Sequence, residues 1–146
     1  MLKIYLDTNV WGRAFDEQLQ MRVAEETEAF FKILEGAYYQ RKYSIAGSSI
    51  LDDEIEQIEE KDKREVVEAI VDLFVADKIE KFSRSLHGGI KALGLKDKDA
   101  MHLAFAIGNS DYFITCDDEI LYRKREIEKR YKIKVVNPVE FVREVL

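Results

Sequence analysis

Two aspartates each follow a short apolar run with the composition of a buried strand. Asp7 follows Ile4–Leu6 in "KIYLDTNVWG", and Asp117 follows Tyr112–Cys116 in "DYFITCDDEIL". Aspartate is uncommon in strands, and a carboxylate is costly to bury unless its charge is paired. Taken alone, either residue fits a simple strand terminator. If both strands run parallel in one sheet, however, both carboxylates emerge at its carboxyl edge, where ligands of α/β proteins gather.

Two more acids stand where helices are predicted to begin. Glu54 lies in "SSILDDEIEQ", where Ser48 or Ser49 is the expected cap, and Asp99 lies in "KDKDAMHLAFAIG", where Asp97 is the expected cap. Acids near a helix N-terminus have a structural explanation, because they stabilise the helix by roughly 0.3–1 kcal/mol. A solvated acidic face is a further explanation for Glu54. Apolar residues follow both acids, so each is expected beside the core.

Four carboxylates brought to one cleft would repel each other, and would either raise their pKa values or recruit a cation. Oxygen ligands without a paired histidine or cysteine favour Mg²⁺ or Mn²⁺ over zinc. Such a metal makes a bound water more acidic and offsets charge on a leaving oxygen, which suits phosphodiester hydrolysis. The set of acids therefore predicts metal-dependent hydrolysis.

The elements that must position these acids follow from the hydrophobic pattern. Strands are predicted at Ile4–Leu6, Tyr43–Ala46, Tyr112–Thr115 and Ile133–Val136. Helices are predicted at about Val23–Gly36, Ser49–Glu60, Lys63–Ala76, Ser83–Leu93, Asp97–Gly108, Asp118–Tyr131 and Pro138–Val145. Strands separated by helical crossovers indicate an α/β fold, a single-domain α/β/α sandwich with a central parallel sheet over residues 1–146.

Composition narrows the functional classes. The chain has 146 residues and a net charge of −6, which argues against a general basic coat for nucleic acid. The single cysteine, Cys116, excludes an internal disulfide and is assigned to the core. His87 and His102 lack a partner at ligand spacing and are assigned structural roles. With no charged leader and no long apolar segment, we expect a cytoplasmic protein that does not span a membrane.

Charge is unevenly distributed along the chain. Residues 50–82 carry 12 acidic against 5 basic residues, whereas residues 119–134 carry 7 basic against 3 acidic ones. A solvated helix face explains the acidic segment. The basic segment is the candidate for contact with a nucleic-acid backbone, with a solvated, internally paired helix as the alternative.

The aromatic stretch "AFFKILEGAYYQRKY" and a glycine pair complete the pattern. Phe30 and Phe31 are predicted in the core, and Tyr38 and Tyr39 are also assigned there. The alternatives for the two tyrosines are a dimer surface or a groove for a partner's helix. Gly88–Gly89 predicts a turn or helix boundary, and lacks the lysine and serine or threonine of a phosphate loop.

The chain resembles the PIN domain family, whose bacterial and archaeal members include VapC-type toxins. The resemblance rests on the order and style of four motifs: "YLDTNV", "SSILDDEIEQ", "KDKDAMHLAFA" and "DYFITCDDEIL". The resemblance covers nearly the whole chain. Position by position it implies four catalytic, metal-holding acids and two supporting polar residues: Asp7, Glu54, Asp99 and Asp117, with Asn9 and Thr115.

Three of these acids have neighbouring carboxylates that offer alternatives. Asp52 or Asp53 could replace Glu54 as the inward acid. Asp97 could support Asp99. Asp118, in the same way, could assist Asp117. Asn9 could instead cap the helix that contains Trp11.

The resemblance implies an endoribonuclease that depends on Mg²⁺ or Mn²⁺, the toxin of a toxin–antitoxin pair, with an RNA substrate, an antitoxin partner and a homodimeric state. An RNA-processing PIN nuclease is the nearest alternative. A haloacid-dehalogenase-like phosphatase, with Asp7 as nucleophile, would need a second aspartate where Asn9 stands. A non-catalytic module that binds nucleic acid or protein is the third alternative.

Overall fold

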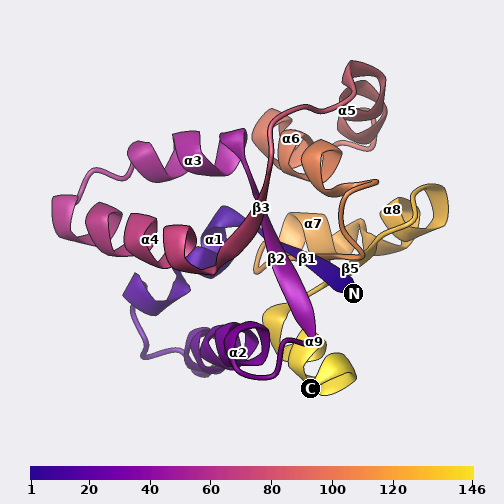
Figure 1. The fold of residues 1–146 in the computed structure, drawn as a ribbon. Helices are drawn as coiled ribbons and strands as arrows, with labels where there is room; N and C mark the ends of the chain where they lie inside the picture. Colours follow the sequence, from indigo (N-terminus) through magenta and orange to yellow (C-terminus); the bar gives the residue numbers. More distant parts are fainter.

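Five parallel strands form the centre of the computed structural model, which describes all residues 1–146 (Figure 1). Their order is β3-β2-β1-β4-β5, and every neighbouring pair is parallel. The strands are β1 (Leu2–Leu6), β2 (Tyr43–Ser48), β3 (Val75–Ile79), β4 (Tyr112–Ile114) and β5 (Lys134–Val136). The α/β class and the parallel sheet predicted from the sequence are confirmed.

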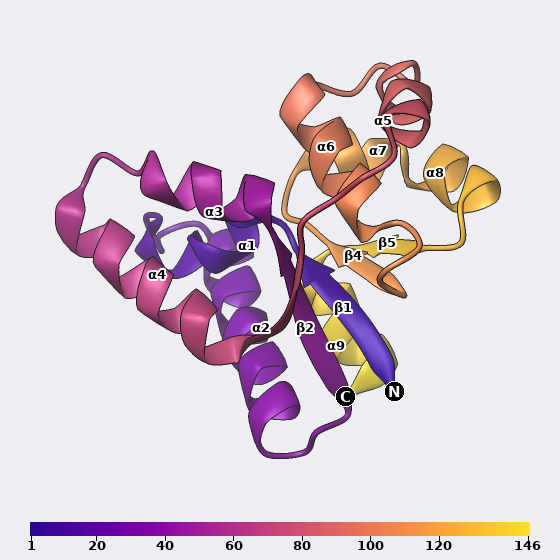
Figure 2. The same ribbon diagram turned by 45° about the horizontal axis from the view of Figure 1, so that its top comes forward.

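Helices cover both faces of this sheet. They are α1 (Thr8–Trp11), α2 (Met21–Tyr38), α3 (Ser49–Glu56), α4 (Lys61–Phe74), α5 (Arg84–Lys91), α6 (Asp97–Ala106), α7 (Asp118–Tyr122), α8 (Lys124–Arg130) and α9 (Pro138–Val145), with a 3₁₀ turn at Arg13–Phe15. Figure 2 shows α5, α6, α7 and α8 together on one side of the sheet, with α2 and α9 on the other. No helix combines the length and the apolar content needed to cross a bilayer.

Successive residues of β1 serve the two layers in turn. Ile4 and Leu6 belong to the cluster that packs against α2, α4 and α9, whereas Tyr5 belongs to the cluster around α6. Because neighbouring side chains on a strand point to opposite faces, a central strand covered on both sides must be apolar throughout. All three residues are fully buried, and Asp7 follows them directly after the end of β1.

The strand β3 was not predicted, and the helix expected over Lys63–Ala76 ends at Phe74 instead. This edge strand is only partly buried, and its centre, Ala76–Lys78, is exposed, so it lacks the apolar pattern of a strand. The helix expected over Asp118–Tyr131 is also divided, because Arg123 interrupts it between α7 and α8.

Several predictions about the aromatic stretch were wrong. Phe30 is buried as expected, but Phe31, Tyr38 and Tyr39 are exposed, Tyr39 at 78%. These three side chains lie on the outer surface of α2 and its C-terminal end. The core assignment failed because one face of α2 packs on the sheet while its other apolar residues face outward.

Local assignments near two other helices also need correction. Ser48 caps α3 by accepting a hydrogen bond from a backbone amide, as expected. Asp97 is not a cap, because Lys96 occupies that position of α6 and Asp97 is the first helical residue. Gly88–Gly89 lies inside α5 rather than in a turn.

Candidate active site at the carboxyl edge of the sheet

Asp7 is held by a dense set of hydrogen bonds directly after β1. The residue is 4% exposed, and Oδ1 accepts a bond of 2.8 Å from the backbone amide of Thr8, so Asp7 rather than Asn9 caps α1. Oδ2 accepts bonds from Thr115 Oγ1 at 2.8 Å and Asn9 Nδ2 at 3.2 Å. Burial raises the pKa of Asp7, although these donors and the nearby His102 act against that shift. The donors explain why a strand can end on a buried aspartate.

Asn9 and Thr115 link the ends of β1 and β4. Asn9 donates to both Asp7 and Thr115, and its Oδ1 accepts a bond of 3.0 Å from the amide of Cys116. Thr115 Oγ1 also accepts from the amide of Asp117 at 3.0 Å. Asp117 in turn caps α7 through Oδ1. The two polar residues therefore fix the positions of both strand-end carboxylates.

Glu54 reaches this edge from α3. Its Oε1 accepts a hydrogen bond of 2.6 Å from Thr8 Oγ1 and contacts Nε2 of His102, whose ring also lies 3.8 Å from Asp7 Oδ1. Burial acts to raise the pKa of Glu54, but the bonds from His102 and Thr8 outweigh it and hold the pKa below its usual value. Glu54 is therefore kept as a carboxylate.

His102 lies at this edge, where sequence reasoning did not place it. Its ring is buried in α6, and Nδ1 contacts the hydroxyl of Tyr5 at 2.6 Å, which contacts Ser48 Oγ at 2.6 Å. Burial alone would lower the pKa of His102, yet the contact with Glu54 and the charge of Asp7 raise it. The available signal was its position three residues after Asp99, which places both on nearby faces of one helix.

Asp99 carries an unsatisfied oxygen. Its Oδ2 is buried and has no hydrogen-bond partner, which is unusual for a carboxylate. Burial raises its pKa to about 6, and the charges of Asp7 and Asp117 add to the effect. Asp99, in α6, therefore lies close enough to Asp7 and Asp117 at the strand ends for their charges to act on it.

The alternative acids are engaged elsewhere. Three of the four form ion pairs: Asp52 with Lys78, Asp97 with His87 and Lys91, and Asp118 with Arg22. The fourth, Asp53, is exposed. Among the acids of α3, Glu54 is the one directed toward Asp7.

The donor set suits a hard cation, although it does not form a complete cage. No three carboxylate, histidine or cysteine side chains converge closely enough to enclose one ion. Mg²⁺ does not require this, because it keeps several waters and takes only one or two carboxylates from the protein. A cation would give the free oxygen of Asp99 a partner. It would also offset the repulsion between Asp99 and the carboxylates of Asp7 and Asp117.

A buried ion cluster supports the same edge from α2. Glu26 is 1% exposed and accepts bonds from Arg13 at 2.6 Å and Arg22 at 3.3 Å, and it also contacts the amide of Asn137. Arg22 extends from this cluster to the carbonyl of Cys116, at 2.9 Å. The loop that carries Asp117 is thus tied to α2 through a buried carboxylate.

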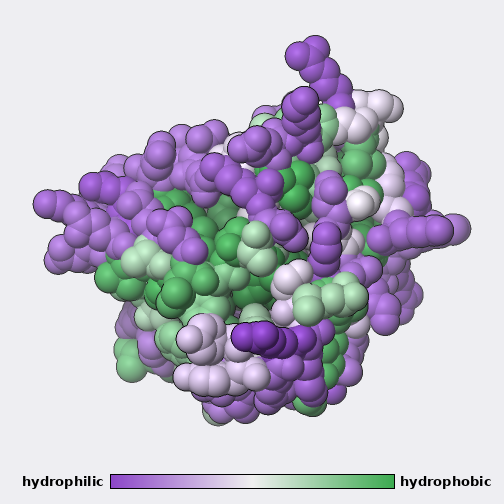
Figure 3. Space-filling view, viewed as in Figure 1, coloured by the Kyte–Doolittle hydropathy of each residue, from purple (hydrophilic) through white to green (hydrophobic).

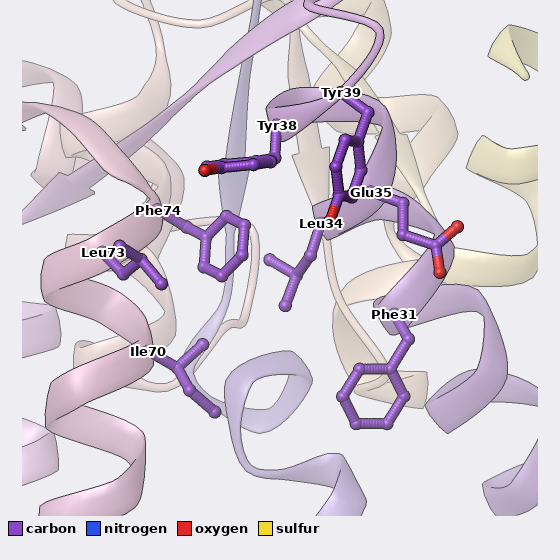
Figure 4. Close-up of a pocket in the computed structure, with 8 residues that line it drawn as sticks. All are labelled: Phe31, Leu34, Glu35, Tyr38, Tyr39, Ile70, Leu73 and Phe74. Atoms are coloured by element: carbon purple, nitrogen blue, oxygen red, sulfur yellow. The ribbon is translucent and has the colours of Figure 1, made fainter.

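An apolar groove lies away from this edge, between α2 and α4. Figure 4 shows Phe31 and Leu34 of α2 facing Ile70 and Phe74 of α4 across it. Figure 3 shows hydrophobic residues gathered on the face where α4 and α2 lie in Figure 1. The groove holds about 460 Å³, and Tyr38, Tyr39, Leu73 and Glu35 complete its lining.

Comparison with known proteins supports the fold. A chain of the crystal structure of VapBC2 from Rickettsia felis, bound to a DNA fragment from their promoter, matches with a TM-score of 0.59. The match covers 93% of this chain and 98% of that chain, at 19% sequence identity. No protein-family model matches the sequence, and no curated protein matches it. The likeness establishes that the two chains share a fold.

Proposed function

We propose that this protein is a PIN-type endoribonuclease that depends on Mg²⁺ or Mn²⁺ and acts as the toxin of a toxin–antitoxin pair. The observation that carries the proposal is the free, buried oxygen of Asp99 beside Asp7 and Asp117, with Glu54 at the same edge. The sequence motifs and the shared fold with a VapBC2 chain support the same assignment.

Asp99, together with Asp7 or Asp117, would hold the cation, and Glu54 would complete the acidic edge. When bound, such a metal supplies charge neutralisation for a scissile phosphate and a more acidic water. Thr115 and Asn9 keep Asp7 oriented through their bonds to its Oδ2. The rigid hydrogen-bonded arrangement limits the freedom of the carboxylates before substrate arrives.

Glu54 and His102 form the second functional pair of this proposal. Because its pKa is lowered, Glu54 stays ionised at neutral pH. The imidazole of His102 holds the carboxylate from behind and is itself held by Tyr5. His102 is therefore a positioning residue for Glu54.

The phosphatase alternative fits the geometry less well. Both oxygens of Asp7 accept hydrogen bonds that fix its orientation, from Thr8 at Oδ1 and from Thr115 and Asn9 at Oδ2. Asn9, at the position where the second catalytic aspartate would stand, is used to bridge Asp7 and Thr115. These contacts favour an orienting role over nucleophilic attack.

The apolar groove between α2 and α4 supports an antitoxin partner. Its aromatic and aliphatic lining is largely exposed, and contiguous apolar surface of this kind marks a protein-binding site. Glu35, Asp72 and Glu65 lie on the two helices that form it. We assign to this groove an amphipathic antitoxin helix with basic flanks. The homodimer remains a prediction.

Cleavage of a panel of structured and single-stranded RNAs tests the nuclease proposal. The wild type should cleave in Mg²⁺ or Mn²⁺ and not in EDTA, and Asp7→Asn and Asp99→Asn should each abolish cleavage.

Induced expression separates the toxin from an RNA-processing enzyme: the wild type should arrest growth, whereas Asp7→Asn should not. Absence of cleavage by folded, metal-loaded wild type over the whole panel would reject the nuclease.

A further inference from the structure

A second hollow adjoins the acidic edge, between the segment before α6 and the helix α7. It holds about 420 Å³, which is within the range of small-ligand sites. Its lining combines backbone, apolar, aromatic and charged groups: Gly94, Leu95, Asp118, Glu119, Tyr122 and Arg123. This mixture differs from the apolar groove between α2 and α4.

The walls of this hollow continue into the candidate active site. Gly94 and Leu95 lead into α6, whose first turn carries Asp99. Asp118 and Glu119 directly follow Asp117 at the start of α7. An RNA strand whose phosphate lies at the carboxylates would therefore pass this hollow on one side of the site.

Tyr122 presents a free aromatic face there. It is 88% exposed and makes no aromatic contact within the fold, whereas Ile120 of the same helix is fully buried. The guanidinium of Arg123, the residue after Tyr122, packs against Gly94. A Cβ added to Gly94 would lie 3.3 Å from Nη2 of Arg123. Gly94 has φ of +96°, a backbone conformation that favours glycine at this point.

The acids of the lining are already compensated by neighbouring cations. Asp118 pairs with Arg22 at 2.8 Å, and Glu119 lies 3.9 Å from Lys96. Lys98, which is exposed and makes no ion pair in the structure, lies on the same α6 turn as Asp99 and is close enough to lower the pKa of Glu54. The cation of the hollow itself is Arg123, whose partly exposed guanidinium lies 3.6 Å from Glu126 in a surface ion pair. An anionic backbone can compete for such an exposed pair, and Lys98 adds positive charge at the acidic edge.

We propose that this hollow is a subsite for one unpaired nucleotide of the RNA substrate, with the base stacked on Tyr122 and the guanidinium of Arg123 against the base or its phosphate. Stacking on an exposed aromatic ring is open only to a base that is not already stacked in a duplex. The proposal rests on the proposed function, and it deepens that function by placing one unpaired nucleotide of the substrate at this hollow, beside the acidic edge.

Fluorescence anisotropy with a labelled single-stranded RNA tests this subsite in an Asp7→Asn background, in Mg²⁺, where cleavage is expected to be blocked. Adding Tyr122→Ala should weaken binding at least about fivefold, because one stacked base contributes roughly 1–3 kcal/mol. Tyr122→Phe keeps the ring and should bind within twofold of the parent. Leu19→Ala, another exposed apolar residue, is the control for a general surface change and should also bind like the parent.

Three outcomes would overturn the proposal: binding within twofold after Tyr122→Ala, equal weakening for duplex RNA, or no RNA binding by the parent. Failure of the nuclease proposal looks different. In that case the wild type cleaves nothing in Mn²⁺, while the loss of single-stranded RNA affinity in Tyr122→Ala persists and still supports the subsite.

Discussion

Replacing Asp99 by asparagine should stabilise the metal-free protein, although the residue is a proposed metal ligand. Its pKa of about 6, against an ordinary 3.8, means that the fold disfavours the ionised form. Two pKa units correspond to about 3 kcal/mol, and screening of this partly exposed group leaves about 1–2 kcal/mol. Asp99→Asn removes the charge and should therefore raise the free energy of unfolding at pH 7 by that amount.

The size of this effect depends on pH. Because the folded state binds the Asp99 proton more tightly than the unfolded state, the stability of the wild type should fall as pH rises from about 4 to about 6. The advantage of Asp99→Asn should thus be complete above pH 6 and nearly absent near pH 3.5. Thermal unfolding in EDTA measures it as a rise of roughly 2–8 °C at pH 7.

Saturating Mn²⁺ should reverse the order of stability. Ligand at 100 times its Kd stabilises the native state by about 2.7 kcal/mol, and the wild type should gain this while Asp99→Asn gains much less. Asp97→Asn is the matched control. It removes the same charge two residues before Asp99, at a carboxylate that is exposed and pairs with His87 and Lys91. The reasoning is refuted if Asp99→Asn is less stable than the wild type in EDTA at pH 7, or if Mn²⁺ stabilises both equally.

Three further substitutions probe other parts of the structure. Glu26→Ala leaves two guanidinium groups without their buried carboxylate and should lower the free energy of unfolding by about 3–5 kcal/mol in urea; a loss under 1 kcal/mol would contradict the role of the cluster. His102→Gln should reduce metal affinity or cleavage roughly 10- to 100-fold with an unchanged circular dichroism spectrum, since it frees Glu54; unchanged activity would rule out a positioning role. Leu73→Glu should abolish antitoxin binding while the melting temperature stays within about 2 °C, and retained binding would move the partner elsewhere.

The sequence was sufficient for the parallel sheet because its central strands are buried on both faces and so carry unbroken apolar runs. Strand-end position then predicted that Asp7 and Asp117 would share an edge, since the carboxyl ends of parallel strands meet there. β3 escaped prediction because an exposed edge strand needs no apolar pattern. Its residues instead continue the helical periodicity of α4.

The site was harder to predict where tertiary contacts decide the role of a residue. His102 looked structural because no ligand-spaced partner stands near it in sequence, yet the fold sets it against Glu54, which is 48 residues away. Tyr38 and Tyr39 looked like core residues, but whether an aromatic helix face meets a sheet or solvent depends on how the helix is rotated. Local pattern alone does not specify that rotation.

The most direct test is a crystal structure of the wild type grown with Mn²⁺, with the metal located by anomalous scattering. The account predicts a peak at the carboxyl edge of the sheet, in contact with Asp99 and with Asp7 or Asp117, and no such peak in Asp99→Asn crystals. A protein saturated with Mn²⁺ that shows no peak at this edge, or shows one only among other surface acids, would contradict the proposed metal-dependent site.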